Sequence, residues 1–208
     1  MHWLDPDYLP KLSGTFECFL LNPHGDADGM ILTDGIEVHF PPHLSNDMRS
    51  AIPPGAKPNV TIRGVRARGS EMIAAVAIDL PDGTRILDNG PEKDRKRKKK
   101  EGKHAPALKH HPMHAEGIVR CVLHGPKGET RGLLLMDGKT IRFPPHEAKR
   151  VAHVLSAGKE VAVRGDGLES ALGTVIEARE LGSSPDDLQA LKHEKPKQRK
   201  DEKHRQPS

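Results

Sequence analysis

The chain has 208 residues, of which 30% are charged, 35% hydrophobic and only 3% aromatic, and its formal net charge is +4. Because rings are so scarce, any core must be built from Val, Ile, Leu, Met and Ala. No run approaches the roughly 20 apolar residues of a membrane span, and residues 1–14 lack the basic region and apolar stretch of a secretory signal. The sequence therefore predicts a cytoplasmic protein without a membrane partner, in which Cys18 and Cys121 stay reduced.

The sequence repeats itself at a spacing of 103 residues, so that residues 14–55 align with residues 117–158 without a gap. A shift of two residues then aligns 60–64 with 161–165. Such self-similarity indicates a structural unit that occurs twice. The identical pairs are Gly14/Gly117, Cys18/Cys121, Leu20/Leu123, Pro23/Pro126, Gly25/Gly128, Gly29/Gly132, Leu32/Leu135, Asp34/Asp137, Gly35/Gly138, Phe40/Phe143, Pro41/Pro144, Pro42/Pro145, His43/His146 and Gly55/Gly158.

In chain order, each copy begins with a strand, a turn containing Pro and Gly, and a short apolar run. Asp-Gly follows at 34–35 and again at 137–138, and it favours a hairpin because both residues tolerate positive φ. The next strand alternates apolar and polar residues until Pro-Pro, which cannot donate to a sheet, ends it. These strands are predicted at 15–21, 30–32 and 38–40, and at 118–123, 133–136 and 141–143.

A short helix and two more strands complete each copy. Apolar residues at helical spacing predict the helix, and Ser45 is expected to be the N-cap of the first one. The apolar helix residues are Leu44, Met48, Ala51 and Ile52 in the first copy, and Val151, Val154 and Leu155 in the second. The last two strands are predicted at 59–65 and 72–80, and at 160–164 and 172–178.

Five strands with one helix between the third and the fourth is the order of the OB-fold, a partly open Greek-key barrel. The sequence therefore predicts a mainly β protein with two OB-like five-stranded small barrels, although a single sheet or another small barrel would fit the same order. The predicted divisions are an N-terminal extension at 1–12, module 1 at 13–91, a basic linker at 92–114, module 2 at 115–182 and a charged tail at 183–208.

The run LLNPHGDADGMILTDGIEVHFPPH, residues 20–43, resembles a largely uncharacterised family of bacterial proteins with the pattern LLNPHG…DG…FPPH. The resemblance covers both copies and is clearest in the first. It implies a bacterial protein with a shared fold, and it implies no activity.

The excess positive charge lies outside the two modules. Residues 1–91 carry 7 basic and 12 acidic side chains, and residues 115–190 carry 10 and 11. The linker, in contrast, carries 9 basic and 3 acidic side chains, and residues 191–208 carry 7 and 3. Both basic segments are polar and nearly free of β-branched or aromatic residues, so we expect them to be disordered.

The first function hypothesis is binding of DNA or RNA. A dense basic run neutralises phosphates and releases their counterions, which gives salt-sensitive binding with little sequence preference. Module 2 is expected to help, because it has basic residues where module 1 has His24, Asp28 and His39. The candidate nucleic-acid-binding residues are Arg95, Lys96, Arg97, Lys98, Lys99, Lys100, Lys127, Arg131, Arg142 and Arg164.

Other functions fit the same sequence. One alternative is a protein-interaction adapter whose basic segments are solubilising spacers; the basic run would also suit anionic lipid, an acidic protein or an address signal. Another is metal binding by His24, His39 and His43, because imidazoles suit zinc or copper. No Gly-rich phosphate loop, nucleophile elbow or HExxH helix occurs. We therefore expect no enzyme, no cofactor and no catalytic residue.

Overall fold

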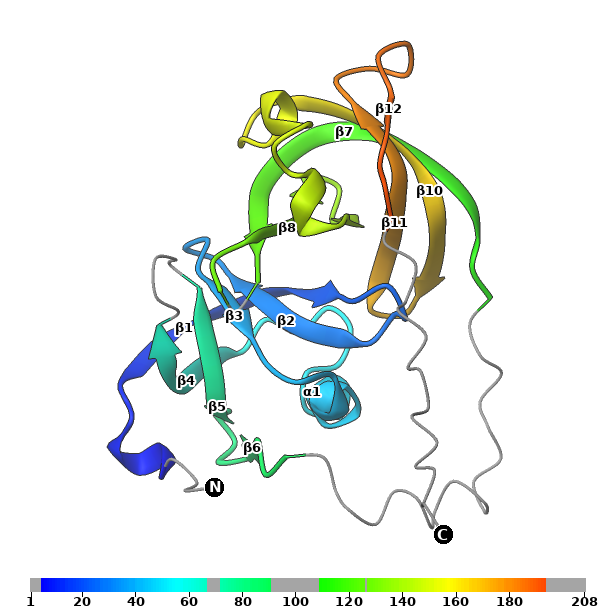
Figure 1. Ribbon diagram of the computed structural model, residues 1–208. Helices are drawn as coiled ribbons and strands as arrows, with labels where there is room; N and C mark the ends of the chain where they lie inside the picture. The colour runs from blue at the N-terminus through cyan, green and yellow to red at the C-terminus, as the bar shows by residue number, and fades with distance from the viewer. Residues whose placement is uncertain (1–4, 67–71, 91–108, 126, 194–208) are drawn as a thin grey trace, which may run out of the picture.

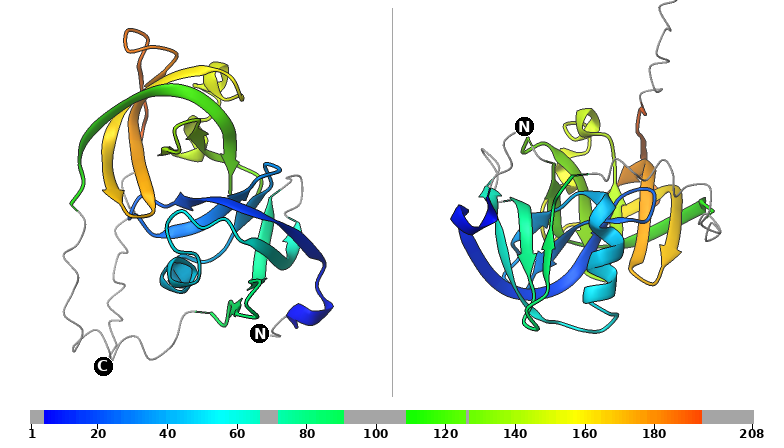
Figure 2. Two further views of the ribbon diagram at one scale, coloured as in Figure 1. Left: turned by 180° about the vertical axis from the view of Figure 1, so that it is seen from behind. Right: turned by 90° about the horizontal axis from the view of Figure 1, so that it is seen from below.

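The computed structural model of the protein describes residues 5–66, 72–90, 109–125 and 127–193. These residues form two β-barrels that pack against each other (Figure 1). Figure 2 shows the same pair from behind and from below. The predicted disorder of the linker and tail falls largely on residues 92–108 and 194–208, which lie outside the described residues.

Module 1 is a closed five-stranded barrel. β1 pairs with β2 and β4, β2 with β3, and β4 with β5, all antiparallel, and a parallel pairing of β3 with β5 closes the barrel. This is the strand order of the OB-fold, so the predicted fold class is confirmed. The elements are η1 (Pro6–Tyr8), β1 (Lys11–Leu21), β2 (Ala27–Leu32), β3 (Glu37–His39), η2 (Pro42–Leu44), α1 (Ser45–Ala51), β4 (Asn59–Arg66), β5 (Ile73–Asp79) and β6 (Arg85–Leu87).

Module 2 repeats this topology. β7 takes the place of β1, and a parallel pairing of β9 with β11 closes the second barrel. β10 and β11 form one long antiparallel hairpin. The elements are β7 (His111–His124), β8 (Thr130–Leu135), β9 (Thr140–Arg142), η3 (Pro145–Glu147), η4 (Ala152–Val154), β10 (Glu160–Ser170), β11 (Gly173–Gly182) and β12 (Gln189–Ala190).

The strands extend beyond several predicted boundaries. β1 starts inside the expected extension, and β7 starts at His111, inside the expected linker. A sixth strand in each module was not predicted: β6 pairs with β5, and β12 pairs with β11. These added strands have two or three residues, which is too short for an alternating pattern to appear in the sequence.

The predicted helix differs between the copies. In module 1 it is α1, whereas the equivalent segment of module 2 has only the 3-10 turn η4; η3 is the counterpart of η2. Both copies contain apolar pairs three and four residues apart, so the spacing in the sequence does not distinguish an α-helix from a 3-10 turn. No helix among the described residues is long and apolar enough to cross a membrane.

Ser45 does not act as the predicted N-cap. It is the first residue of α1, and its hydroxyl accepts a hydrogen bond of 2.9 Å from the backbone N–H of Ala27. The side chain therefore ties the helix to the start of β2.

Each barrel has its own aliphatic core, as the composition predicts. Phe40 and Phe143, at equivalent positions after the third strands, are 4% and 5% exposed, which confirms that they are core residues. The Asp-Gly hairpins also form, and Gly35 and Gly138 have φ of 84° and 86°. Asp34 Oδ1 caps its turn by accepting from the N–H of Ile36.

Candidate functional site

The two modules meet through the outward faces of their first two strands. Leu20, Ile31, Leu123 and Leu134 form one buried cluster there, with Cys18 and Cys121 packed against it. These residues are equivalent pairs in the repeat. Each module therefore offers the same patch to the other, as in an isologous dimer contact, but within one chain.

A pair of equivalent residues has diverged into opposite charges at this contact. Glu17 and Arg120 occupy the same position in the two copies and form an ion pair across the contact. The hydrogen bond from Arg120 lowers the pKa of Glu17. Two identical modules would place like charges opposite each other, so this pair favours association of unlike copies.

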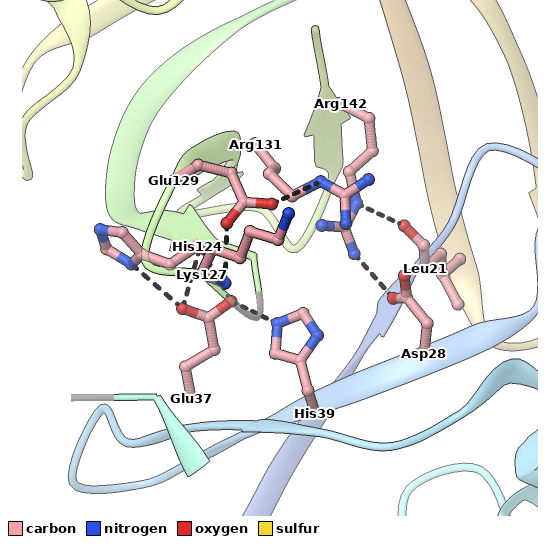
Figure 3. A network of polar contacts seen from close by, with 9 residues as sticks. All are labelled: Leu21, Asp28, Glu37, His39, His124, Lys127, Glu129, Arg131 and Arg142. Carbon is pink, nitrogen blue, oxygen red and sulfur yellow. Dashed lines mark hydrogen bonds and ion pairs between the residues drawn. The ribbon is translucent and has the colours of Figure 1, made fainter. Parts of the chain in front are cut away.

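Polar contacts extend the module–module contact along the third strands (Figure 3). The Glu37 carboxylate accepts from the backbone N–H of His124 at 3.0 and 3.1 Å and lies 2.8 Å from His39 Nε2. Arg142 Nε donates to the carbonyl of Leu21 at 2.8 Å. Glu37 on β3 thus binds the end of β7, and Arg142 on β9 binds the end of β1.

Arg142 and Asp28 form a buried ion pair, with 2.7 Å between Nη2 and Oδ1. Burial lowers the pKa of Arg142 and raises the pKa of Asp28, and in each case the charge of the partner opposes the effect of burial. Both directions disfavour the charged forms. Each ion is therefore costly to bury without the other.

The β10–β11 hairpin adds a second contact. Leu168 and Val175 are 1% exposed and belong to the apolar core of module 1, and Leu172 packs against it. In Figure 1 the hairpin descends from module 2 to the level of β1. Two surfaces that commonly bind ligands in OB-folds are thus engaged by the neighbouring module: the face of strands two and three, and in module 2 the loop between strands four and five.

Arg142 must be removed from the candidate nucleic-acid residues. Its side chain is 8% exposed, and both Asp28 and the Leu21 carbonyl bind it, so a phosphate cannot reach it in this arrangement. Burial follows from the position of Arg142 on β9, which faces module 1.

The other predicted basic residues are dispersed. Lys127 and Arg131 are exposed in and beside one loop, where Arg131 lies 4.0 Å from Glu129. Figure 3 shows both side chains near Arg142. Arg164 lies on β10, 59% exposed and 3.6 Å from Glu180. The linker residues are outside the described parts of the chain: Arg95, Lys96, Arg97, Lys98, Lys99 and Lys100.

The three histidines of the metal hypothesis have separate surroundings. His39 is paired with Glu37, His43 Nε2 lies 3.2 Å from Asp88 Oδ1, and His24 is exposed. Among the described residues, no group of three or more His, Cys, Asp or Glu side chains is placed to hold a metal ion.

Sequence reasoning missed the acidic half of the contact, which consists of Glu17, Asp28 and Glu37. One signal was available: among the aligned positions, Glu17 matches Arg120, a reversal of charge in an apolar strand. Phe16, Phe19, Phe40 and Phe143 are all buried, so no phenylalanine ring is exposed on the described faces of the barrels.

Comparisons with known proteins add little. No family model and no curated protein matches the chain. Among solved structures, a deletion mutant of the single-stranded DNA binding protein from Thermus aquaticus is similar, with 13% identity, coverage of 90% of this chain and 95% of that chain, and a TM-score of 0.25. A TM-score this low supports no conclusion about this chain, and the bacterial family resemblance stays a prediction.

Proposed function

We propose that this protein is a non-enzymatic bacterial protein of the cytoplasm that associates with DNA or RNA through its linker and tail. The charge distribution carries the proposal: 16 of the 33 Lys and Arg residues lie in 92–114 and 191–208, and the modules themselves are slightly acidic. Such segments bind phosphates by counterion release and do not distinguish sequences.

The described part of the chain supports a role for the linker and tail, rather than the modules, as the main binding segments. OB-folds that bind single strands commonly stack bases on exposed aromatic side chains. Among the described Phe, Tyr and Trp residues, Tyr8 is the one that is exposed. The paired faces of the modules are closed by their mutual contact. The barrels therefore serve as the folded body, and Lys127 and Arg131 are positioned to add phosphate contacts.

Fluorescence anisotropy with labelled single-stranded DNA, duplex DNA and RNA across a salt series tests the proposal. The full chain is compared with a variant in which Arg95, Lys96, Arg97, Lys98, Lys99 and Lys100 are Gln. We expect each lost phosphate contact to reduce the salt slope by about 0.7 to 0.9. The double variant Lys127→Gln and Arg131→Gln measures the share of module 2. An absence of binding by the full chain at low salt would overturn the proposal.

A protein-interaction role is the second candidate. It is favoured by a separate observation, a groove on module 2 that has a filled counterpart on module 1.

A further inference from the structure

In module 1, a chain segment covers the outer face of β4. The N-terminal residues 5–9 cross this face and include the turn η1. Arg63 Nη1 donates to the Pro6 carbonyl at 3.4 Å and lies 3.1 Å from Asp7 Oδ1, and Arg85 contacts the same carboxylate at 3.0 Å. Because of this segment and of Asp79, which accepts from Arg63 Nε at 2.7 Å, the Arg63 side chain is only 10% exposed.

Arg164 occupies the same position in module 2. Arg63 lies opposite Lys11 in β1, Arg164 lies opposite His114 in β7, and each arginine precedes a β-bulge. The chain before this point takes a different course, however. β7 continues to pair with β10 back to His111, so within the described residues the chain before Ala115 does not turn across the face. The Arg164 side chain is 59% exposed as a result.

The uncovered face of module 2 is a groove with a volume of about 820 Å³. Its apolar lining includes Met113, Ala162, Pro185 and Leu188, and Leu188 stands where module 1 has Arg85. The charged residues of the groove are Arg164, Arg179 and His114 with Glu116, Asp166 and Glu180. Arg179 is paired with Asp166, whereas among the described residues the one ion pair of Arg164 is its 3.6 Å contact with Glu180. One guanidinium is thus available to a stronger acceptor.

We propose that this groove binds an acidic, proline-containing peptide segment of a partner protein. A carboxylate and the preceding carbonyl of the peptide contact Arg164, as Asp7 and Pro6 contact Arg63 in module 1. The apolar lining receives the proline ring, whose fixed φ suits the turn seen in η1. The residues that line this groove do not include the basic run at 95–100.

The probe is a fluorescent synthetic peptide with the sequence LDPDYLP, residues 4–10 of the chain itself, titrated with the full-length protein. We expect Arg164→Gln to weaken binding at least ten-fold. The matched control is Lys149→Gln, which removes an exposed positive charge of module 2 outside the groove. It should leave the affinity unchanged. A peptide with both Asp residues changed to Asn should also bind at least ten-fold more weakly.

Amide chemical shifts locate the peptide. Shifts around Arg164, Arg179 and Leu188 support the proposal. Shifts confined to the surroundings of Arg63 would mean that the peptide displaces residues 5–9 of module 1, and they would overturn it. A lack of binding at millimolar peptide would also overturn it, as would an affinity that Arg164→Gln does not change.

Two further readouts separate this proposal from its alternatives. Light scattering tests whether the groove binds the N-terminal segment of a second copy. A dimer that dissociates in the Arg164→Gln variant would show that the occupant is a second copy, and it would overturn the proposal of a partner protein. The variant in which the basic residues 95–100 are Gln should bind oligonucleotides more weakly and bind the peptide with unchanged affinity. Failure of one proposal is therefore distinguishable from failure of the other.

Discussion

Three carboxylates of module 1 make polar contacts with module 2: Glu17, Asp28 and Glu37. Their partners are side chains or an N–H of module 2. The negative charge on this side of the contact comes from individual residues, because the aligned positions in module 2 are not acidic. At the residue scale, the two copies are complementary rather than identical.

Arg142→Met should destabilise the protein by about 3 kcal/mol, because Asp28 would remain buried without its partner. Urea unfolding measures the change. Arg131→Met, an exposed neighbour, should change stability by less than about 0.5 kcal/mol. Adding Asp28→Asn to Arg142→Met should recover part of the loss, and a further loss would contradict the account of the pair.

The Glu17–Arg120 pair should make stability depend on pH. Its hydrogen bond lowers the pKa of Glu17 below the ordinary 4.5, so the contribution is present above that value and is lost as pH falls through the lower folded-state pKa. Both side chains are partly exposed, so we expect at most about 1 kcal/mol. The free-energy difference between the natural protein and Glu17→Gln should have its full size near pH 6 and decrease as the pH falls below 4.5. A difference that does not decrease with falling pH would exclude this cause.

At the scale of elements, the β10–β11 hairpin is part of the module 2 barrel, but side chains near its tip pack in the core of module 1. Its pairing runs without interruption from Gly165 to the tip at Ser170 and Gly173. Beyond the expected strand end at 164, the hairpin carries Leu168 into the core of module 1. The hairpin thus contributes side chains to the apolar cores of both modules.

Leu168→Ala should therefore destabilise module 1 although the residue lies in module 2. A buried Leu replaced by Ala loses about 2 to 5 kcal/mol. Urea unfolding followed by hydrogen exchange of β1 and β4 amides detects the loss in module 1. Met136→Ala, at a site that is 64% exposed, is the control and should change stability little. Destabilisation limited to amides of module 2 would refute this role of the hairpin.

Much of each barrel could be predicted from the sequence, because the repeat, the Asp-Gly hairpins and Pro-Pro mark the order of strands. The contact between barrels was harder to predict. The sequence feature that indicates this contact is the pair of apolar runs at 30–32 and 133–135, in which the side chains on both faces of the strand are apolar. Such runs indicate strands that are buried on both faces. They do not say what covers the outer face, so Arg142 was expected at the surface.

At the scale of the whole molecule, the two barrels form one body with a shared apolar cluster. Cys18 and Cys121 lie against that cluster from either module. Burial raises the pKa of Cys121 to about 11 and also raises that of Cys18. Thiols of this kind react slowly because the thiolate is the nucleophile.

Alkylation by iodoacetamide should therefore report separation of the modules. At pH 8 a pKa near 11 gives about a hundred-fold less thiolate than the ordinary 9.0. We expect both cysteines to become reactive at one urea concentration, together with global unfolding, as followed by mass spectrometry. A cysteine introduced by Ser156→Cys, at an exposed site, should react throughout. Reaction of either native thiol well before unfolding would show that the barrels part independently.

The charge reversal at Glu17 and Arg120 makes each copy depend on the other. A lone module 1 that paired with itself through this patch would bring two carboxylates together, and a lone module 2 would bring two guanidinium groups together. This contact therefore disfavours a symmetric dimer of either half. A module on its own would also expose its part of the apolar cluster, Leu20 and Ile31 or Leu123 and Leu134, to solvent.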